Sequence, residues 1–277
     1  MRRARRISAV AVCLLLCVTA DVAPGQAAGD AEDPAVLLKR AFEKMFNYPS
    51  VRTVELRVLR GGRLAGRKVF DVAYQKFGER GHTILRFRAP EYLRDNALLM
   101  IEAESGENDT WLYQPGEGRI RRVSAYQKAD SFYGSDLTFE DLENRRWSNY
   151  EIRDFGRLLE TGGEFRVIEA SPRRYSQHSR ILVYLSPVTL AIGRIEFYKG
   201  TENALAKTIR ILPKDVVEED GVFKPSRMTV EVAGREWVTE VLFKRIEVAP
   251  ELTTREFSTM RLHAEGRDLF EMVDRAK

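Results

Sequence analysis

The sequence predicts a mainly β protein built on one large antiparallel sheet that is strongly curved or closed. Short runs of alternating apolar and polar residues follow one another along most of the chain, and turn-rich connections separate them. A long helical pattern occurs near the N-terminus, at residues 34–47. No internal repeat and no Pro/Ser-rich linker divides the chain. We therefore expect a single domain over residues 21–277.

The N-terminus has the features of an export signal. Four arginines precede the apolar run at residues 8–18, which is too short to span a bilayer comfortably. Small residues end this region at Ala20, and a second such stretch lies at 25–29. We predict a signal peptide at residues 1–20, cleaved after Ala20, and a protein that is soluble in a bacterial periplasm.

Removal of this segment changes the charge and the cysteine content. The whole chain has 45 basic and 41 acidic residues, and residues 1–20 contain four arginines and no acid. The mature chain is therefore neutral, which gives no case for nucleic acid as a partner. Cys13 and Cys17 both lie in the apolar run, so disulfides, thiolate catalysis and cysteine-bound metal are excluded afterwards. Leu16 before Cys17 argues against a lipoprotein.

The first predicted element is an amphipathic helix over residues 34–47. Pro34 suits a first helical turn, and Asp33 can cap it. Leu37, Leu38, Ala41, Phe42 and Met45 lie at helical spacing and define one apolar face.

Alternation with a period of two follows directly. Residues 53–60 and 68–75 flank a glycine turn and predict a hairpin. Further strands are predicted at 82–90 and 96–102, and a second hairpin at 109–124.

Residues 125–160 interrupt the strands. We expect a loop-rich insertion with a short helix or two, because Thr138 and Asp141 have the spacing of a capping box. Glu140 and Asp141 would lie in the first turn of such a helix, where negative charge is favoured.

Strands are expected again in the second half of the chain, and a short helix at residues 265–277. The predicted strands are 164–170, 179–186, 191–200, 206–214, 223–234 and 237–248. A curved sheet of this size needs cover on its concave side, for which the N-terminal helix and the insertion are the candidates. If they do not fill that space, an apolar cavity remains.

The residue types that carry catalysis are sparse. His82, His178 and His263 are dispersed without metal-ligand spacing, and we interpret them as surface histidines. Ser135 and Asp136 could join a distant histidine in a triad, but no spacing supports this arrangement. We predict no catalytic residues, no metal and no cofactor.

Two basic stretches remain, residues 119–122 and 173–180. We interpret both as solvated strand ends, with contact to a lipid headgroup as the alternative.

Three blocks of the sequence, at residues 85–102, 109–124 and 131–142, together resemble the outer-membrane lipoprotein-sorting-like family, which is related to the periplasmic carrier LolA. One departure is the Asp95-Asn96 pair, where an Arg-Gly pair is expected. The matching residues are Phe87, Pro90, Trp111, Leu112, Tyr113, Pro115, Arg121, Arg122, Ser131, Phe132, Gly134, Ser135, Asp136, Leu137, Phe139 and Asp141.

The resemblance implies a half-open β-barrel, in which helices close the concave side of one curved antiparallel sheet. It further implies a carrier or adaptor that binds lipid or lipidated cargo in an apolar cavity. Relatives of this kind often accompany RND-type inner-membrane transporters, so transport to the outer membrane with such a partner is the implied role. Residues 131–142 would form a structured rim or lid, with Phe132, Tyr133 and Phe139 at the cavity mouth. Plain core packing of these three aromatic residues is the alternative.

Candidate cavity residues come from one face of the alternating strands, from the helix and from this rim. They are Leu38, Phe42, Met45, Leu56, Val58, Phe70, Val72, Leu85, Phe87, Leu98, Met100, Trp111, Tyr113, Phe132, Phe139, Phe197, Met228 and Val230. A lipid-sensing or structural adaptor module without carrier activity is the alternative. A lipid hydrolase is disfavoured, because only three dispersed histidines could serve as its base.

Overall fold

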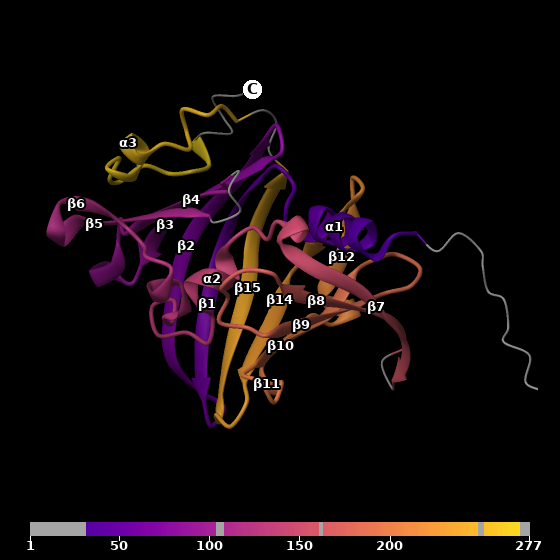
Figure 1. Cartoon of the computed structure of the whole chain (residues 1–277). Coiled ribbons are helices and arrows are strands. Elements are labelled where there is room, and N and C mark those ends of the chain that lie inside the picture. Colours follow the sequence, from indigo (N-terminus) through magenta and orange to yellow (C-terminus); the bar gives the residue numbers. More distant parts are fainter. Residues whose placement is uncertain (1–31, 104–107, 161–162, 249–251, 272–277) are drawn as a thin grey trace, which may run out of the picture. The chain divides into compact units, whose positions relative to one another are not determined.

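The computed structural model of the chain describes residues 32–103, 108–160, 163–248 and 252–271. The predicted signal peptide and both cysteines lie outside these residues. The described residues belong to one compact unit, and its architecture is dominated by a single sheet (Figure 1).

Within the described residues, thirteen antiparallel strands form this sheet in the order β6-β5-β4-β3-β2-β1-β15-β14-β11-β10-β9-β8-β7. The first and last strands of the order are not joined, so the sheet is curved and open, as the half-open fold class predicted. The strands are β1 (Ser50–Arg60), β2 (Arg63–Phe77), β3 (Arg80–Ala89), β4 (Ala97–Ile101), β5 (Asp109–Gln114), β6 (Arg119–Arg122), β7 (Tyr150–Glu160), β8 (Gly163–Pro172), β9 (Arg180–Leu185), β10 (Ile192–Lys199), β11 (Ala204–Arg210), β14 (Arg227–Val232) and β15 (Trp237–Val248). A separate hairpin joins β12 (Val216–Glu219) to β13 (Val222–Pro225).

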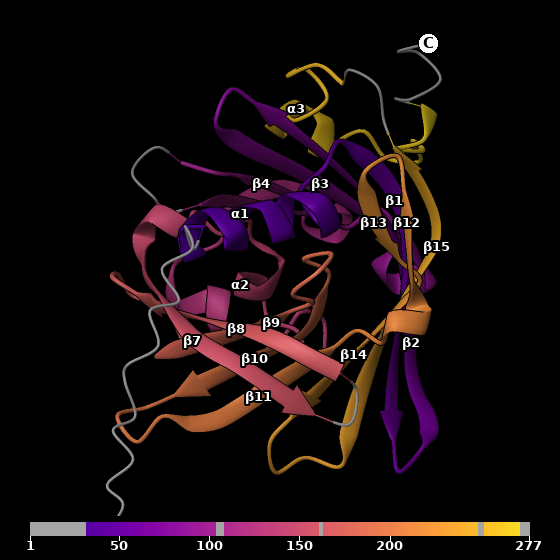
Figure 2. The same cartoon turned by 90° about the vertical axis from the view of Figure 1, so that its right-hand side faces the viewer.

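The two halves of the sheet meet where β1 pairs with β15. This ladder runs from Ser50 opposite Val248 to Arg60 opposite Trp237, with one irregularity between Thr53 and Val54. The first strand of the chain therefore lies beside the last, and the sheet bends around the space between its two halves (Figure 2).

The concave face holds the larger apolar core. Alternate residues of the strands point into it, such as Leu98 and Met100 on β4 and Val183 on β9. Strands β2–β5 also carry apolar residues on their other face, because residues 252–271 cover the outside of the sheet there. Ala97 and Leu99 pack with Leu262 and Phe270 of this C-terminal segment. A strand here is apolar on both faces because the core covers its inner face and the C-terminal segment covers its outer face.

The N-terminal helix is confirmed as α1 (Pro34–Met45), with Asp33 as its cap. The Asp33 carboxylate accepts from the Ala35 N–H at 2.8 Å. Its buried residues are the five that the helical spacing predicted, Leu37, Leu38, Ala41, Phe42 and Met45. Figures 1 and 2 show α1 and the short α2 on the inner side of the sheet.

The insertion contains α2 (Phe139–Leu142) and two 3₁₀ turns, η3 (Tyr126–Ala129) and η4 (Trp147–Asn149). The predicted capping box is present, and the Asp141 carboxylate accepts from the Thr138 N–H at 2.7 Å. The other short helices are η1 (Glu91–Leu93), η2 (Pro115–Glu117), η5 (Pro213–Asp215) and α3 (Thr259–Leu262).

Several predicted elements were wrong. The insertion ends at residue 149, because β7 occupies residues 150–160. This strand is at the sheet edge and is largely exposed, so both of its faces take charged residues and the alternating pattern is lost. The predicted strand at 223–234 is divided into β13 and β14. In the predicted C-terminal helix, residues 265–270 are turns and loop, residue 271 is helical, and residues 272–277 lie outside the described part, so the second half of this prediction is not tested.

Candidate functional site

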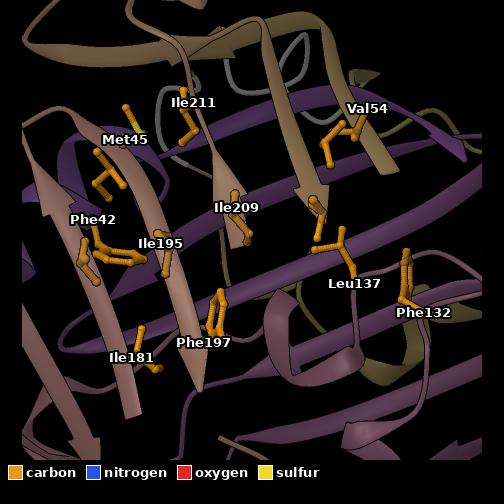
Figure 3. Packing of buried hydrophobic residues seen from close by; sticks show 14 of the residues in the cluster. Phe42, Met45, Val54, Phe132, Leu137, Ile181, Ile195, Phe197, Ile209 and Ile211 are labelled. Carbon is orange, nitrogen blue, oxygen red and sulfur yellow. The ribbon is translucent and has the colours of Figure 1, made fainter. Parts of the chain in front are cut away.

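A cavity of about 190 Å³ lies between the concave face of the sheet, α1 and the residues around α2. Figure 3 shows how side chains from these three sources point toward one another, with Phe42 of α1 near Ile195 and with Leu137 between Val54 and Phe132. The strand residues that line the cavity are almost all apolar: Val54, Leu56, Phe70, Val72, Leu85, Met100, Ile195, Phe197, Ile209, Met228, Val241 and Phe243, with Arg52, Tyr74 and Thr83 as the polar members.

The helix α1 contributes one wall. Its Phe42 ring lies 4.8 Å from the ring of Trp147, centroid to centroid, and Phe46 follows at its C-terminal end. The buried Arg52 guanidinium donates to the Phe46 carbonyl at 2.8 Å and lies 4.4 Å from the Tyr48 ring. The guanidinium thus lies in largely apolar surroundings beside the C-terminal end of α1, and this burial lowers the pKa of Arg52 from its ordinary value.

The rim segment, defined here as residues 131–142, is a fixed structure. Phe132 is fully buried, and its ring packs against Phe70, Phe87 and Phe139. Gly134 has a φ of +74°, which confirms the expected turn. The Asp136 N–H donates to the Thr239 hydroxyl at 3.0 Å, and that hydroxyl donates to the Asp136 carboxylate at 2.7 Å. The segment is thereby attached to β15.

A buried charge cluster lies where α2 meets the second half of the sheet. The Asp141 carboxylate accepts from the Lys207 ammonium, and its other oxygen lies 3.7 Å from His178 and 3.8 Å from Arg145. Burial alone would raise the pKa of Asp141, but Lys207, His178 and Arg145 hold it well below the usual range. Lys207, His178 and Arg145 also surround the Phe197 ring.

The structure brings most of the predicted cavity residues together. Eight of them line the cavity: Phe42, Leu56, Phe70, Val72, Leu85, Met100, Phe197 and Met228. Seven others belong to the same core or pack against it without lining the cavity: Leu38, Met45, Phe87, Leu98, Phe132, Phe139 and Val230. Val58 is buried on β1 but does not belong to this core.

Trp111 and Tyr113 lie on the opposite face and need correction. On β5 it is Leu112 that faces the core, opposite Leu98 of β4. Trp111 and Tyr113 instead pack toward the C-terminal segment, where the Tyr113 ring lies 4.6 Å from His263. Both faces of this strand are apolar, so alternation alone could not indicate which one faces inward.

The histidine interpretation also needs correction. His178 is buried beside Asp141, whereas His82 is half-buried and His263 is exposed. The triad arrangement is not formed, because the Ser135 hydroxyl donates to the Phe132 carbonyl at 2.7 Å and Asp136 is bound to Thr239.

Lys207 and Arg145 had no sequence signal as site residues, since they approach Asp141 only in the folded chain. Among the described residues, no group of three His, Cys, Asp or Glu side chains is placed to hold a metal ion. No helix in the described part of the chain combines the length and the apolar content needed to cross a bilayer.

Comparisons with known proteins place the chain in a family and a fold. A family model with the description "Uncharacterized protein" matches residues 79–264. No curated protein matches the chain.

Among the solved structures that match, three illustrate the shared fold. One is described as an outer membrane lipoprotein-sorting protein domain from Vibrio parahaemolyticus, with 20% identity, a TM-score of 0.75 and coverage of 83% of this chain and 97% of that one. A DUF1329 family protein from Desulfovibrio piger has 22% identity, a TM-score of 0.75 and coverage of 83% and 100%. A LolA superfamily protein from Nitrosomonas europaea has 17% identity, a TM-score of 0.68 and coverage of 82% and 98%.

These likenesses confirm at the level of the fold the resemblance that the sequence blocks indicated. The chain belongs to the family that the matching model defines, and its fold is the LolA-like fold of the outer membrane lipoprotein-sorting proteins.

Proposed function

We propose that this protein is a periplasmic carrier or adaptor that holds an acyl chain of a lipid or lipidated protein in the cavity. The observation that carries the proposal is an apolar cavity of about 190 Å³ that is bounded by the sheet, by α1 and by the residues around α2. Dry apolar cavities of this size bind small apolar molecules. Burial of a methylene group contributes about 0.8 kcal/mol.

The volume sets a limit on what fits without rearrangement. A water molecule takes about 30 Å³ of liquid, and a methylene group is of similar size, so the cavity holds about six such groups. A longer acyl chain must displace resident side chains. One of the covering elements therefore has to move when cargo enters.

We propose that α1 moves and that the rim segment stays. The rim segment is held by the buried Asp141–Lys207 pair and by Thr239, and hydrocarbon cannot replace these contacts. The contacts of α1 are mainly apolar, and an entering chain can substitute for them at little net cost. Its ion pair between Lys44 and Glu218 is substantially exposed, and such pairs contribute about 0–1 kcal/mol.

Cavity filling tests this function. Met228 lines the cavity on β14, and Glu231 is exposed on the same strand. In Met228→Trp we expect binding of palmitate, measured by titration calorimetry, to weaken at least tenfold with the fold retained. The matched variant Glu231→Trp should bind as the wild type does. Equal binding by all three proteins, or no binding of any single-chain lipid by the wild type, contradicts the carrier proposal.

The proposal also includes the route of the cargo and the partner protein. We propose that the cargo is passed toward the outer membrane together with an inner-membrane transporter of the RND type, in line with the resemblance in the sequence blocks. Photo-crosslinking from exposed positions of α1, such as Val36, in living cells tests this partnership. Crosslinks to an inner-membrane transporter are expected, and their absence while crosslinks to other envelope proteins form would contradict it.

A further inference from the structure

A second, polar pocket of about 420 Å³ adjoins the apolar cavity. Glu143, Asn144 and Arg145 line both spaces, so one short stretch of chain separates them. A ligand with an apolar part and a polar part could therefore occupy the two together.

The polar pocket collects cations from distant parts of the sequence. Arg122 comes from β6, Lys128 from η3 and Arg174 from the loop between β8 and β9. The two basic stretches of the sequence, 119–122 and 173–180, thus meet at one pocket. Among the described residues, five cationic side chains and two carboxylates line it.

Both carboxylates are already engaged by the protein. Glu140 accepts from the Gln177 N–H at 3.2 Å. Glu143 accepts from the Thr110 hydroxyl at 2.9 Å and is paired with the Lys128 ammonium at 2.7 Å, so one of the five cations is neutralised inside the pocket. Arg146 is paired with Glu102, outside the pocket lining, at 3.1 Å. Arg122 is paired with Asp109, but its side chain is two-thirds exposed, and such surface pairs exchange at little cost. The pocket is therefore suited to an anion.

Arg145 stands at the junction of the two spaces. Its side chain is nine-tenths buried, and its Nη2 has no hydrogen-bond partner among the described residues. The nearest carboxylate oxygen is Asp141 Oδ1 at 3.8 Å, which is beyond hydrogen-bond distance. A buried donor without an acceptor is unfavourable, and a phosphate oxygen is the acceptor that a guanidinium matches best.

We propose that the polar pocket binds the phosphate-bearing headgroup of a lipid whose acyl chain occupies the apolar cavity, with Arg145 at the phosphate. This inference rests on the proposed carrier function and adds the class of lipid. At about 30 Å³ for each water-sized group, the pocket holds about fourteen of them. It thus has room for a phosphate and a small polar alcohol, which is more than a fatty-acid carboxylate needs.

Three probes with the purified protein test the proposal by titration calorimetry: palmitoyl-lysophosphatidylglycerol, monopalmitoylglycerol and inorganic phosphate. The first two share an acyl chain and differ in the phosphate. We expect the phospholipid to bind about tenfold more tightly than the monoacylglycerol, because hydrogen bonds to charged groups are the stronger class.

Three variants test which residues cause the preference for the phospholipid over the monoacylglycerol. Arg145→Met should remove the tenfold difference between the two lipids, whatever its effect on the affinity for monopalmitoylglycerol, because Arg145 also lines the apolar cavity. Arg174 is at an exposed position, and Arg174→Met should reduce the difference in affinity between the two lipids. This variant tests the proposal even if Arg145→Met fails to fold. Arg94→Met, on the exposed Arg94 outside this pocket, is the matched control and should keep the full preference.

The outcomes separate the two proposals. Equal binding of both lipids by the wild type overturns the headgroup site and leaves the carrier function intact. A preference that survives in Arg145→Met and Arg174→Met also overturns it. Inorganic phosphate that binds as tightly as the phospholipid identifies a free anion as the occupant and overturns the lipid assignment. If neither lipid binds, the carrier function and this inference both fail.

Discussion

Thr239 on β15 donates its hydroxyl hydrogen to the Asp136 carboxylate across 2.7 Å, and it accepts the Asp136 N–H at 3.0 Å. These two residues are 103 positions apart in the sequence, and both are buried. The pair joins the rim segment to the strand at which the two halves of the sheet meet. The rim segment is therefore attached to the sheet by buried polar contacts, whereas the contacts of α1 are mainly apolar.

Removal of the Thr239 hydroxyl should lower the free energy of unfolding. In Thr239→Val the shape is kept, but a buried carboxylate loses its donor, which costs about 1–3 kcal/mol. Urea unfolding monitored by circular dichroism measures the change. Thr201→Val, at an exposed turn, should leave the unfolding free energy within about 0.5 kcal/mol of the wild type. A similar small change in Thr239→Val would show that the rim segment is not held there.

Removal of the Lys207 ammonium should have a larger effect. Lys207→Met leaves the buried Asp141 carboxylate without its contacting cation, and breaking such a pair costs about 3–5 kcal/mol. Lys199→Met removes an exposed ammonium nearby in the same hairpin and serves as the control. Unfolding free energies of the two variants that do not differ would contradict the assignment of a buried ion pair.

Acid sensitivity should depend on His178. Burial lowers the pKa of His178 below its ordinary value of 6.5, although the neighbouring Asp141 opposes this shift. Between the lowered and the ordinary pKa the unfolded chain binds more protons, so the stability due to this group falls as the pH drops below about 6.5. His178→Gln should therefore lose less stability between about pH 7.5 and pH 5 than the wild type.

The matched variant for this prediction is His263→Gln, since His263 is exposed. It should keep the pH dependence of the wild type in parallel urea titrations. An unchanged dependence in His178→Gln would mean that the histidine titrates in the folded protein as it does in the unfolded chain.

Arg52 should stabilise the packing of α1 against the sheet. This guanidinium donates to the Phe46 carbonyl at 2.8 Å, just after the end of the helix. In Arg52→Met we expect amide hydrogen exchange over residues 37–46 to become at least about tenfold faster, because a hydrogen bond to a charged group contributes about 1.5–3 kcal/mol. Mass spectrometry of peptic peptides measures these rates.

Arg86 offers a matched control on the other face of the sheet. Its guanidinium donates to the Arg261 carbonyl at 2.7 Å. Arg86→Met should accelerate exchange in residues 252–271 and leave α1 unchanged. Exchange in α1 that is slow and insensitive to Arg52→Met would contradict the proposal that this helix is the movable cover.

The alternation of apolar residues predicted one large curved antiparallel sheet, and the resemblance of three sequence blocks implied its half-open form and an apolar cavity. Phe70, Val72 and Leu85 do line the cavity, but alternation alone did not decide which face of their strands points inward, because Phe77 and Ile84 are apolar on the other face. The helix α1 was predicted with its cap, because Asp33, Pro34 and the apolar spacing indicate the same start.

The errors have physical causes that one sequence cannot reveal. Trp111 and Leu112 are both apolar because the C-terminal segment covers the outer face of β5, a contact about 150 residues away in the chain. The strand β7 has a neighbour on one side only and carries charges on both faces. Lys207 and His178 become buried partners of Asp141 through tertiary pairing, which leaves no local pattern.

A crystal structure with a phospholipid brominated along its acyl chain tests the central claim most directly. We predict anomalous bromine peaks inside the sheet, between Phe197 and Leu85, with α1 shifted and the rim segment in place. Bromine peaks only on the outer surface, with Phe42 still against Trp147 and the cavity empty of lipid, would contradict the proposal that this sheet carries acyl chains.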